Sequence, residues 1–416
     1  MTQTLPPQPW MTAPPTQAVI AALAAAGGPD CARFVGGCVR DALLKRPIGD
    51  IDIATTLHPD AVTAALVAAG LKAVPTGIEH GTVTGISAGK PFEITTLRRD
   101  VETDGRRAVV AFTDDWAEDA ARRDFRLNAL YLSPDGTLHD PTGGGIADAH
   151  AGRIVFVGEA ETRIREDYLR ILRFFRFSAW FGRGEPDAEG LAACAALKDG
   201  VRGLSGERVS KELLKLLAAD DPRSAVRLMA ATGVLGALLP AAGDLHRFEG
   251  VVEIETEMLF TEDAALRLAA LLPDDRDAVA DAAQRLRLSG ALRDRLLAAC
   301  SDGLRLVSWM SPREIRRAIY RLGARAFQDR IKLAWAASNR PVTYPQWRML
   351  LVYADTWTPP SFPLDGEEIM AAGVPQGPLI GQVRREVEDW WLDLDFTDDK
   401  MAVLERLKAV AQGLAY

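Results

Sequence analysis

Two adjacent glycines, followed by a pair of aspartates, constrain this chain more than any other feature. Gly36 and Gly37 end the apolar run that includes Phe34, and a helical pattern follows them. Glycine lets backbone N–H groups approach a phosphate closely, and the positive end of a helix favours the phosphate charge. The segment therefore predicts a phosphate-binding turn between a strand and a helix.

Asp50 and Asp52 follow on a segment whose pattern predicts a strand. Because side chains alternate along a strand, we expect both carboxylates on one face, with Ile51 and Ile53 facing the core. Such oxygen ligands suit Mg²⁺, which binds through one or two carboxylates together with substrate phosphates. Alone, a Gly-Gly is usually a turn and an Asp-x-Asp a solvated strand edge. Their order and separation favour metal-assisted attack on a nucleoside triphosphate.

Length and patterning predict several domains. The 416 residues are 48% hydrophobic and 25% charged, as in globular proteins with ample core. Strand-like runs alternate with helices in the first part of the chain, which predicts an α+β head with a mixed sheet, and the remainder is helical. The expected strands are residues 33–35, 51–54, 82–87, 92–96, 129–132 and 153–156. The expected divisions are a loose N-terminal extension and first helix (1–29), the head (30–150) and a helical neck (151–240), body (241–340) and tail (341–416).

The cysteines and the apolar runs bear on the compartment. The four cysteines show no Cys-x-x-Cys spacing, which fits a reducing cytoplasm and argues against structural zinc or disulfides. The alanine-rich run at 19–26 is too short to span a membrane. We therefore expect a cytoplasmic protein without membrane association.

The order Gly-Gly, one helix, then Asp-x-Asp resembles the class II tRNA nucleotidyltransferases, which include the CCA-adding enzymes and the bacterial poly(A) polymerases. The resemblance implies a polymerase-β-like head whose catalytic residues, Asp50 and Asp52, hold two Mg²⁺ ions. Glu93 on the adjacent expected strand is a candidate third carboxylate. The implied contacts to the nucleotide in this first signature are Gly36, Gly37 and Arg40.

A second signature lies at residues 122–130. A guanidinium can pair with two phosphate oxygens, and a short carboxylate or amide can bond a ribose hydroxyl, although a helix-capping cluster would use the same residues. By resemblance, Arg123 contacts the triphosphate or nucleotide, and Asp124 and Asn128 contact the sugar. The family usually carries Thr where this chain has Arg126, which is unexplained. Residues 140–148 resemble the hinge between head and neck, one residue longer through a third glycine.

Two further segments carry the resemblance within the head. Residues 100–112 are polar, and their simplest interpretation is a surface loop. They resemble the flexible loop that helps the family switch from adding C to adding A, with Asp104, Arg106 and Arg107 as the implied residues. The sequence His-Gly-Thr-Val-Thr at 80–84 is more similar to the CCA-adding branch than to the poly(A) branch.

Asp167 and Arg170 lie three apart in a helical pattern, so they are expected on one face. An intrahelical salt bridge is the ordinary interpretation. The motif, however, is similar to the Glu-Asp-x-x-Arg base reader of the family. Cytosine and adenine both offer an amino donor beside a ring-nitrogen acceptor, whereas uracil and guanine would leave buried polar groups unpaired, at about 1–3 kcal/mol each. This pair could therefore select CTP and ATP without a template.

Other basic residues are assigned by position. Arg173 and Arg176 extend the base-reading row and are expected to reach phosphates, while residues 204–213 resemble the last neck motif and are interpreted as structural. Since the net charge is −8, binding of RNA would need local basic strips. The strip with the most closely spaced basic residues contains Arg313, Arg316, Arg317 and Arg321. It could be a solvated helix face, or it could contact tRNA.

The resemblance implies a CCA-adding enzyme that transfers C, C and A from CTP and ATP to the 3′ end of tRNA and releases pyrophosphate. Its partners would be tRNA and nucleoside triphosphates, and no protein partner can be inferred. Two alternatives stay open at this point: a poly(A) polymerase or a relative that adds only CC or only A, and a catalytically silent tRNA-binding protein.

Overall fold

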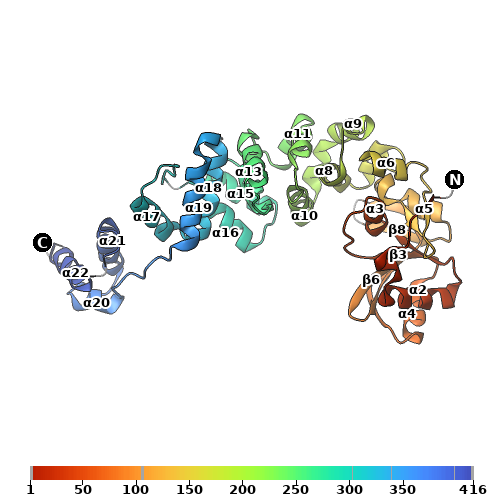
Figure 1. Ribbon diagram of the computed structural model, residues 1–416, viewed down its shortest axis with the longest axis horizontal. Helices are drawn as coiled ribbons and strands as arrows, with labels where there is room; N and C mark the ends of the chain where they lie inside the picture. Colours follow the sequence, from red (N-terminus) through yellow and green to blue (C-terminus); the bar gives the residue numbers. More distant parts are fainter. Residues whose placement is uncertain (1–2, 105–106, 302, 339, 398, 414–416) are drawn as a thin grey trace. The chain divides into compact units, whose positions relative to one another are not determined.

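The chain folds into two compact units, which Figure 1 colours from red at the N-terminus to blue at the C-terminus. The computed structural model describes residues 3–104, 107–301, 303–338, 340–397 and 399–413, and the side chains of residues 100–110 lie outside that description. The first unit comprises residues 1–242 and a short return at 285–287, and the second comprises residues 243–284 and 288–416.

An eight-stranded sheet in the order β1-β10-β9-β2-β3-β6-β5-β4 forms the head of the first unit. Its neighbouring strands pair antiparallel, except that β3 and β6 run parallel. The predicted mixed sheet is therefore confirmed. Its strands are β1 (Gln3–Thr4), β2 (Ala32–Val35), β3 (Asp52–Thr55), β4 (Lys72–Gly77), β5 (Thr82–Ser87), β6 (Lys90–Thr96), β9 (Tyr131–Leu132) and β10 (Thr137–His139).

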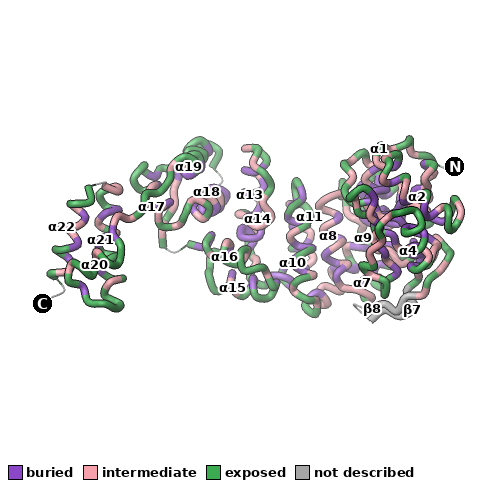
Figure 2. The backbone as a smooth tube through the Cα atoms, turned by 90° about the horizontal axis from the view of Figure 1, so that it is seen from below, coloured by how far each residue is buried: buried purple, intermediate pink, exposed green. Residues whose placement is uncertain are grey.

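Helices cover this sheet and continue into the neck. They are α1 (Pro9–Thr12), α2 (Pro14–Gly27), α3 (Gly37–Leu43), α4 (Pro59–Ala68), α5 (Trp116–Ala121), α6 (Gly145–Ala151), α7 (Ala160–Glu166), α8 (Leu169–Phe181), α9 (Ala188–Ala196), α10 (Gly206–Leu217), α11 (Arg223–Ala231) and α12 (Val234–Leu238), with 3-10 turns η1 (Ile78–His80), η2 (Arg126–Asn128) and η3 (Lys198–Gly203). The many buried segments of the head appear purple in Figure 2. Phe174 of α8 packs on Phe156, with ring centroids 5.7 Å apart, and this core joins α8 to the head.

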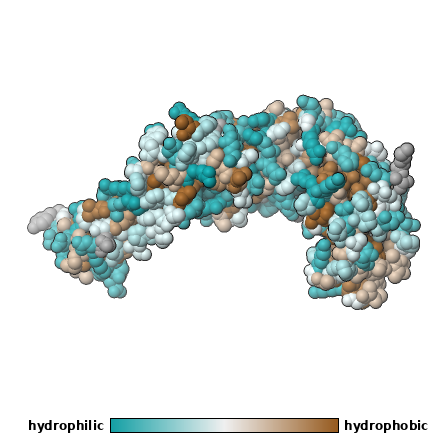
Figure 3. All heavy atoms as spheres, in the orientation of Figure 1, coloured by the Kyte–Doolittle hydropathy of each residue, from teal (hydrophilic) through white to brown (hydrophobic). Residues whose placement is uncertain are grey.

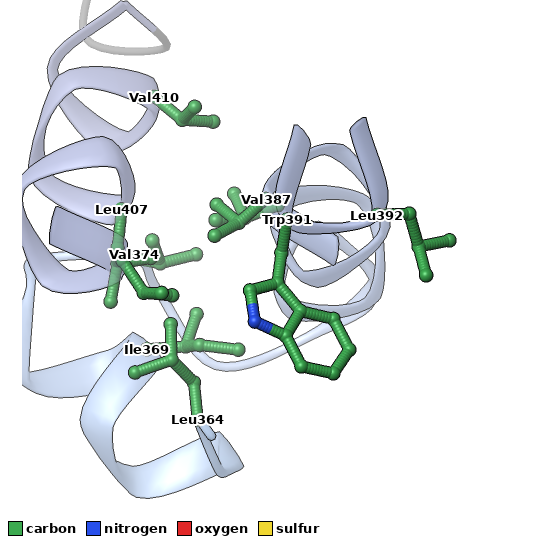
Figure 4. Close-up of a cluster of buried hydrophobic side chains, with 10 residues drawn as sticks. Leu364, Ile369, Val374, Val387, Trp391, Leu392, Leu407 and Val410 are labelled. Carbon is green, nitrogen blue, oxygen red and sulfur yellow. The ribbon is translucent and has the colours of Figure 1, made fainter. Parts of the chain in front are cut away.

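The described part of the second unit contains helices and no strands. They are α13 (His246–Glu257), α14 (Ala264–Leu271), α15 (Arg276–Arg285, whose last residue belongs to the first unit), α16 (Gly290–Ala299), α17 (Pro312–Leu322), α18 (Ala324–Ser338), η4 (Pro341–Thr343), α19 (Tyr344–Thr356), α20 (Gly366–Ala371), α21 (Pro378–Asp393) and α22 (Lys400–Gly413). The last three helices share their own apolar core. Figure 4 shows Val387 of α21 directed toward Leu407 and Val410 of α22, with Trp391 beside Leu364 and Ile369.

Two expectations about local structure are wrong. The described N-terminal residues from Gln3 onward are not loose, because β1 extends the sheet edge along β10 and the Leu5 N–H donates to the Gly136 carbonyl at 2.9 Å. The expected strand at 153–156 makes only one isolated bridge, between Phe156 and Phe125, and the Phe156 ring packs on Phe174 of α8. In a third segment, where a surface loop was the simplest interpretation, β7 (Arg98–Asp104) and β8 (Arg107–Phe112) pair as an antiparallel ribbon.

No helix among the described residues is long and apolar enough to cross a membrane. On the face that Figure 3 shows, hydrophilic residues predominate and the hydrophobic ones form scattered brown patches.

Candidate active site

The two glycines form the turn between β2 and α3. Gly36 has φ 71° and ψ −126°, a backbone conformation that L-residues with a side chain rarely adopt. A Cβ built on Gly36 would lie no closer than 3.9 Å to the Arg123 guanidinium, so the backbone conformation rather than lack of space requires glycine. The turn opens α3 at Gly37, as the sequence predicted.

The two aspartates lie at the start of β3, next to the glycine turn. β3 begins at Asp52, and Asp50 lies just before it and is exposed, while Ile51 and Ile53 are buried as expected. Glu93 of β6 stands opposite Asp52 in the parallel register. Burial raises the pKa of Asp52 to about 6, and the negative charges of Glu93 and Asp50 add to the shift. The three carboxylates therefore form a local excess of negative charge.

This donor set fits a divalent ion. Carboxylate oxygens are the ligands that Mg²⁺ prefers, and bound positive charge would relieve the repulsion between the acids. Among the described residues, no group of three or more His, Cys, Asp or Glu side chains is arranged to hold a metal ion. The phosphate oxygens of a bound nucleotide would therefore have to complete the coordination shell.

Arg123 lies beside the carboxylates and is held by Asp119, which the sequence analysis did not single out. Asp119 Oδ2 accepts from Arg123 Nη2 at 2.9 Å and from the Tyr131 hydroxyl at 2.6 Å, and Oδ1 accepts from Arg122 Nε at 2.8 Å. Burial alone would raise the pKa of Asp119, but Arg123, Arg122 and the Tyr131 hydroxyl outweigh it and lower this pKa to about 2. Asp119 therefore stays charged and fixes the Arg123 guanidinium.

A second chain of hydrogen bonds runs from α3 to the neck. Arg40 Nη1 donates to Asn128 Oδ1 at 2.7 Å, and Asn128 Nδ2 donates to Asp124 Oδ1 at 3.2 Å. Asp124 Oδ2 in turn accepts from Arg173 Nε at 2.8 Å. Burial would raise the pKa of Asp124, yet Arg173 and the hydrogen bonds lower it. Arg40, Asn128 and Asp124, three of the six head residues predicted to contact the nucleotide, thus form a chain of hydrogen bonds that ends at Arg173 of α8.

Glu212 of α10 anchors the arginine row of α8 from the other side. It accepts from Arg176 Nε at 2.6 Å and lies 3.8 Å from Arg173 Nη1. Glu212 is buried, and it belongs to the neck segment that the sequence analysis interpreted as structural. Arg173 thus lies between Asp124 of the head and Glu212 of the neck, and this ties the two parts of the first unit together.

Asp167 and Arg170 differ from the predicted geometry. Asp167 has an extended backbone at the end of α7 and is not helical, and its Oδ1 accepts from the N–H of Leu169, the first residue of α8, at 3.1 Å. Its Oδ2 accepts from Arg208 Nη2 at 2.7 Å. Arg170 instead pairs with Glu166. The two predicted base readers lie in the same segment, but each has a different partner.

The remaining predicted residues belong to the β7–β8 ribbon, to the second unit or to the part of the chain outside the description. Asp104 and Arg107 face each other in the ribbon register, but their side chains, and all of Arg106, lie outside the described residues. The four predicted tRNA contacts of α17 lie in the second unit and bind the end of α21 and the turn after it. Their acceptors are the Asp393 carbonyl for Arg313, Asp395 for Arg316, the Asp393 carboxylate for Arg317 and Asp389 for Arg321.

Sequence reasoning missed Asp119, Arg163, Arg208 and Glu212. Asp119 carried a local signal, because it lies three and four positions before Arg122 and Arg123, a spacing that brings side chains together on a helix. The other three depend on contacts between distant segments. Arg208, for example, lies 41 positions from its partner Asp167.

Two family models match parts of the chain. Residues 32–155 match the family model described as the poly(A) polymerase head domain, and residues 185–245 match the model described as its probable RNA- and SrmB-binding site. With the glycine turn and the carboxylates beside it, these matches define a nucleotidyltransferase.

Individual relatives narrow this class. The mitochondrial CCA tRNA nucleotidyltransferase 1 of Mus musculus is 33% identical over 383 residues, which cover 90% of this chain and 86% of that protein. The CCA-adding enzyme of Geobacillus stearothermophilus is 42% identical over 214 residues, 50% of each chain. The solved CCA-adding enzyme of Bacillus stearothermophilus in complex with CTP covers 97% of this chain and 99% of its own, with a TM-score of 0.76 and 26% identity. The chain belongs to the CCA tRNA nucleotidyltransferase family.

Proposed function

We propose that this enzyme adds C, C and A in turn to the 3′ end of tRNA from CTP and ATP, without a nucleic-acid template. The observation that carries the proposal is the juxtaposition, within one unit, of the Asp52 and Glu93 carboxylates, the Arg123 cluster and the segment with Asp167 and Arg170. Similarity over 90% of the chain to a relative named as a CCA tRNA nucleotidyltransferase supports it.

In the proposed reaction, the 3′-hydroxyl oxygen of tRNA forms a bond to the α-phosphorus of the nucleotide. The bond from that phosphorus to the bridging oxygen breaks, pyrophosphate leaves, and the hydroxyl proton is released to the solvent. Asp50 and Asp52, with Glu93 as a candidate third ligand, would hold two Mg²⁺ ions. When bound, the ions lower the pKa of the hydroxyl and stabilise the departing oxygens.

The protein's own groups would orient the triphosphate and the sugar. Arg123, fixed by Asp119, offers a guanidinium fork to phosphate oxygens, and the Gly36–Gly37 turn offers backbone N–H groups. Asp124 and Asn128 would bond the ribose hydroxyls, and Arg173 would keep Asp124 ionised. Because these groups are already held by hydrogen bonds, little reorganisation is needed when the nucleotide binds.

Base choice would fall to Asp167 and Arg170. Each oxygen of Asp167 uses one lone pair, for Arg208 or for the Leu169 N–H, and retains another that could accept from the amino group of cytosine or adenine. The hydrogen bonds of Arg170 to Glu166 and to the Arg163 carbonyl both leave from Nη1, and a guanidinium has five donors. Uracil and guanine would place a carbonyl oxygen against the Asp167 carboxylate and a ring N–H against the Arg170 guanidinium, so these groups would stay unpaired.

The direct test uses purified protein, Mg²⁺ and tRNA that lacks its terminal CCA. CTP and ATP together should extend the tRNA by C, C and A, and CTP alone should stop after two additions. A long A tract would indicate a poly(A) polymerase, a stop after CC with both nucleotides would indicate a CC-adding enzyme, and addition of A alone to a tRNA that ends in CC would indicate an A-adding enzyme. Binding of tRNA without any product would indicate a silent binding protein.

Two further points are part of the proposal. The buried, unpaired state of all four cysteines supports a cytoplasmic location, although the mammalian relative is named as mitochondrial. A contact between the basic residues of α17 and tRNA also stays a proposal.

A further inference from the structure

Arg163 joins two segments to which the proposed function gives different tasks. It lies in α7, and its side chain is only 11% exposed. Its Nη2 donates to the backbone carbonyls of Arg122 and Arg123, the latter at 3.0 Å. Its Nη1 donates to Glu166 Oε2 at 2.5 Å. One guanidinium therefore connects the backbone of Arg123, the proposed triphosphate contact, to Glu166, which directly precedes Asp167.

Arg170 is attached to Arg163 twice. The same Oε2 of Glu166 that accepts from Arg163 also accepts from Arg170 Nη1. That Nη1 also donates to the backbone carbonyl of Arg163 at 2.6 Å. The position of the Arg170 guanidinium thus depends on where Arg163 holds Glu166.

We propose that Arg163 is a positioning residue that fixes Arg170 relative to the segment of Arg123, so that the base is selected at a defined distance from the bound triphosphate. The inference rests on the proposed function, in which Arg170 contacts the base and Arg123 the phosphates. It assigns to Arg163 no contact with substrate, and its effect on base choice is transmitted through Glu166 and Arg170.

The geometry of the guanidinium supports this role. The two terminal nitrogens of Arg163 are committed to carbonyls on one side and to a carboxylate on the other, so the planar group cannot rotate without breaking one set of bonds. Hydrogen bonds weaken steeply with misalignment, and small displacements of a reading group change discrimination. A purely structural Arg163 would change stability and leave the choice of base unchanged.

The test compares Arg163→Met and Arg163→Lys with Arg165→Met, a matched control on the same helix. Arg165 is 58% exposed and pairs only across the helix surface with Glu161 in the described contacts. For each full-length variant, kcat/KM is measured with CTP, ATP, UTP and GTP on tRNA that lacks its CCA end, together with the thermal unfolding midpoint. Lysine keeps the charge of Arg163 but cannot span both sets of acceptors.

We expect the preference for CTP over UTP to fall about tenfold or more in Arg163→Met and to a smaller extent in Arg163→Lys, with Arg165→Met like the wild type. If Arg163→Met does not fold, Arg163→Lys decides. A preference within about twofold of wild type in the folded variants would overturn the inference.

Two further comparisons separate this inference from its premises. Glu166→Gln should lower the same preference, and combined with Arg163→Met it should add little, because both changes break one connection. Full additivity of the two effects would contradict the connection. If the wild type adds neither C nor A, the proposed function fails; if it does and the Arg163 variants keep its base preference, only the role of Arg163 fails.

Discussion

Asp52 and Glu93 stand opposite each other at the one parallel pairing of the described sheet, between β3 and β6. Because β3 and β6 pair in parallel, the start of β3 lies beside the middle of β6. The carboxylate of Glu93, 41 positions after Asp52 in the sequence, therefore lies beside Asp50 and Asp52. A candidate for a third metal ligand thus follows from strand pairing and not from local spacing.

Asp52→Asn should reduce nucleotide addition at least about 100-fold, because it removes a carboxylate from the proposed metal site. The unfolding midpoint without metal should not fall, since the change relieves repulsion with Glu93 and Asp50. Added Mg²⁺ should raise the midpoint of the wild type and not that of the variant. The exposed Asp60 of α4 provides the control, Asp60→Asn. An Asp52→Asn enzyme with full activity would refute the metal role.

Asp119→Asn should lower stability in a pH-dependent way. The pKa of Asp119 is about 2 in the folded protein, whereas its ordinary value, which we take for the unfolded chain, is 3.8. The ionised carboxylate therefore contributes about 2 kcal/mol to the free energy of unfolding above about pH 4. This contribution is lost as the pH falls through about 2. Denaturant unfolding of wild type and variant should therefore differ fully at pH 7 and progressively less below pH 4.

The exposed Asp114 supplies a comparison for Asp119, since Asp114→Asn should change stability little at any pH. A difference between wild type and Asp119→Asn that stays constant from pH 7 to pH 2 would contradict the assignment. Activity gives a second readout: the KM for CTP should rise in Asp119→Asn, because Arg123 loses its fixed orientation.

Arg208→Met should lower the discrimination of CTP from UTP. Arg208 Nη2 donates to Asp167 Oδ2 at 2.7 Å and so orients the carboxylate that we propose reads the base. Single-nucleotide addition with each triphosphate measures the effect. Lys211→Met, an exposed change on the same helix, should behave like the wild type. Unchanged discrimination in Arg208→Met would assign Arg208 to the packing of α10 alone.

Arg126 gains a structural explanation from its close contacts with Gly144 and Gly145. A Cβ on Gly144 would lie 3.1 Å from Arg126 Nη1, and one on Gly145 would lie 2.4 Å from the Arg126 carbonyl oxygen. The Arg126 guanidinium is 3.9 Å from the buried Asp148, which also pairs with Arg153 at 2.9 Å. The two departures from the family pattern, this arginine and the additional glycine of the segment at 140–148, therefore lie where the two segments pack against each other.

Arg126→Met should destabilise the protein by about 1–3 kcal/mol, because Asp148 stays buried with less positive charge beside it. Asp148→Asn should cost less in the Arg126→Met background than in the wild type, and the difference measures the coupling. Thermal or urea unfolding of the four proteins gives both values. Arg202→Met, which removes an exposed ion pair with Asp199, should change stability by less than about 0.5 kcal/mol. Simple additivity of the two changes would refute the coupling.

How far the sequence predicts this site depends on how local each arrangement is. The Gly36–Gly37 turn and the burial of Ile51 and Ile53 follow from neighbouring residues, and both were predicted. The partners of the arginines were not predicted. Arg173, for example, pairs with Asp124, which lies 49 positions away in the sequence, and its spacing relative to other acids does not indicate this partner. Such pairs form when the fold brings distant segments together, and the spacing of residues in the sequence does not predict them.

The arginines of α17 illustrate the same point and give the last prediction. Arg316 donates to Asp395 and to the Tyr353 hydroxyl, and Tyr320 of the same helix packs on Trp391 with ring centroids 5.7 Å apart. Arg316→Met should therefore lower the unfolding midpoint and change the tryptophan fluorescence of the tail, whereas Arg321→Met, which removes an exposed pair with Asp389, should change neither by much.

Titration of tRNA at several salt concentrations tests whether these arginines contact tRNA: direct phosphate contacts would lower the salt slope of the affinity by about 1 for each variant. A lower slope for Arg321→Met with unaltered stability would support the proposed contact between α17 and tRNA. An unchanged slope would contradict it and leave Arg321 to its pair with Asp389.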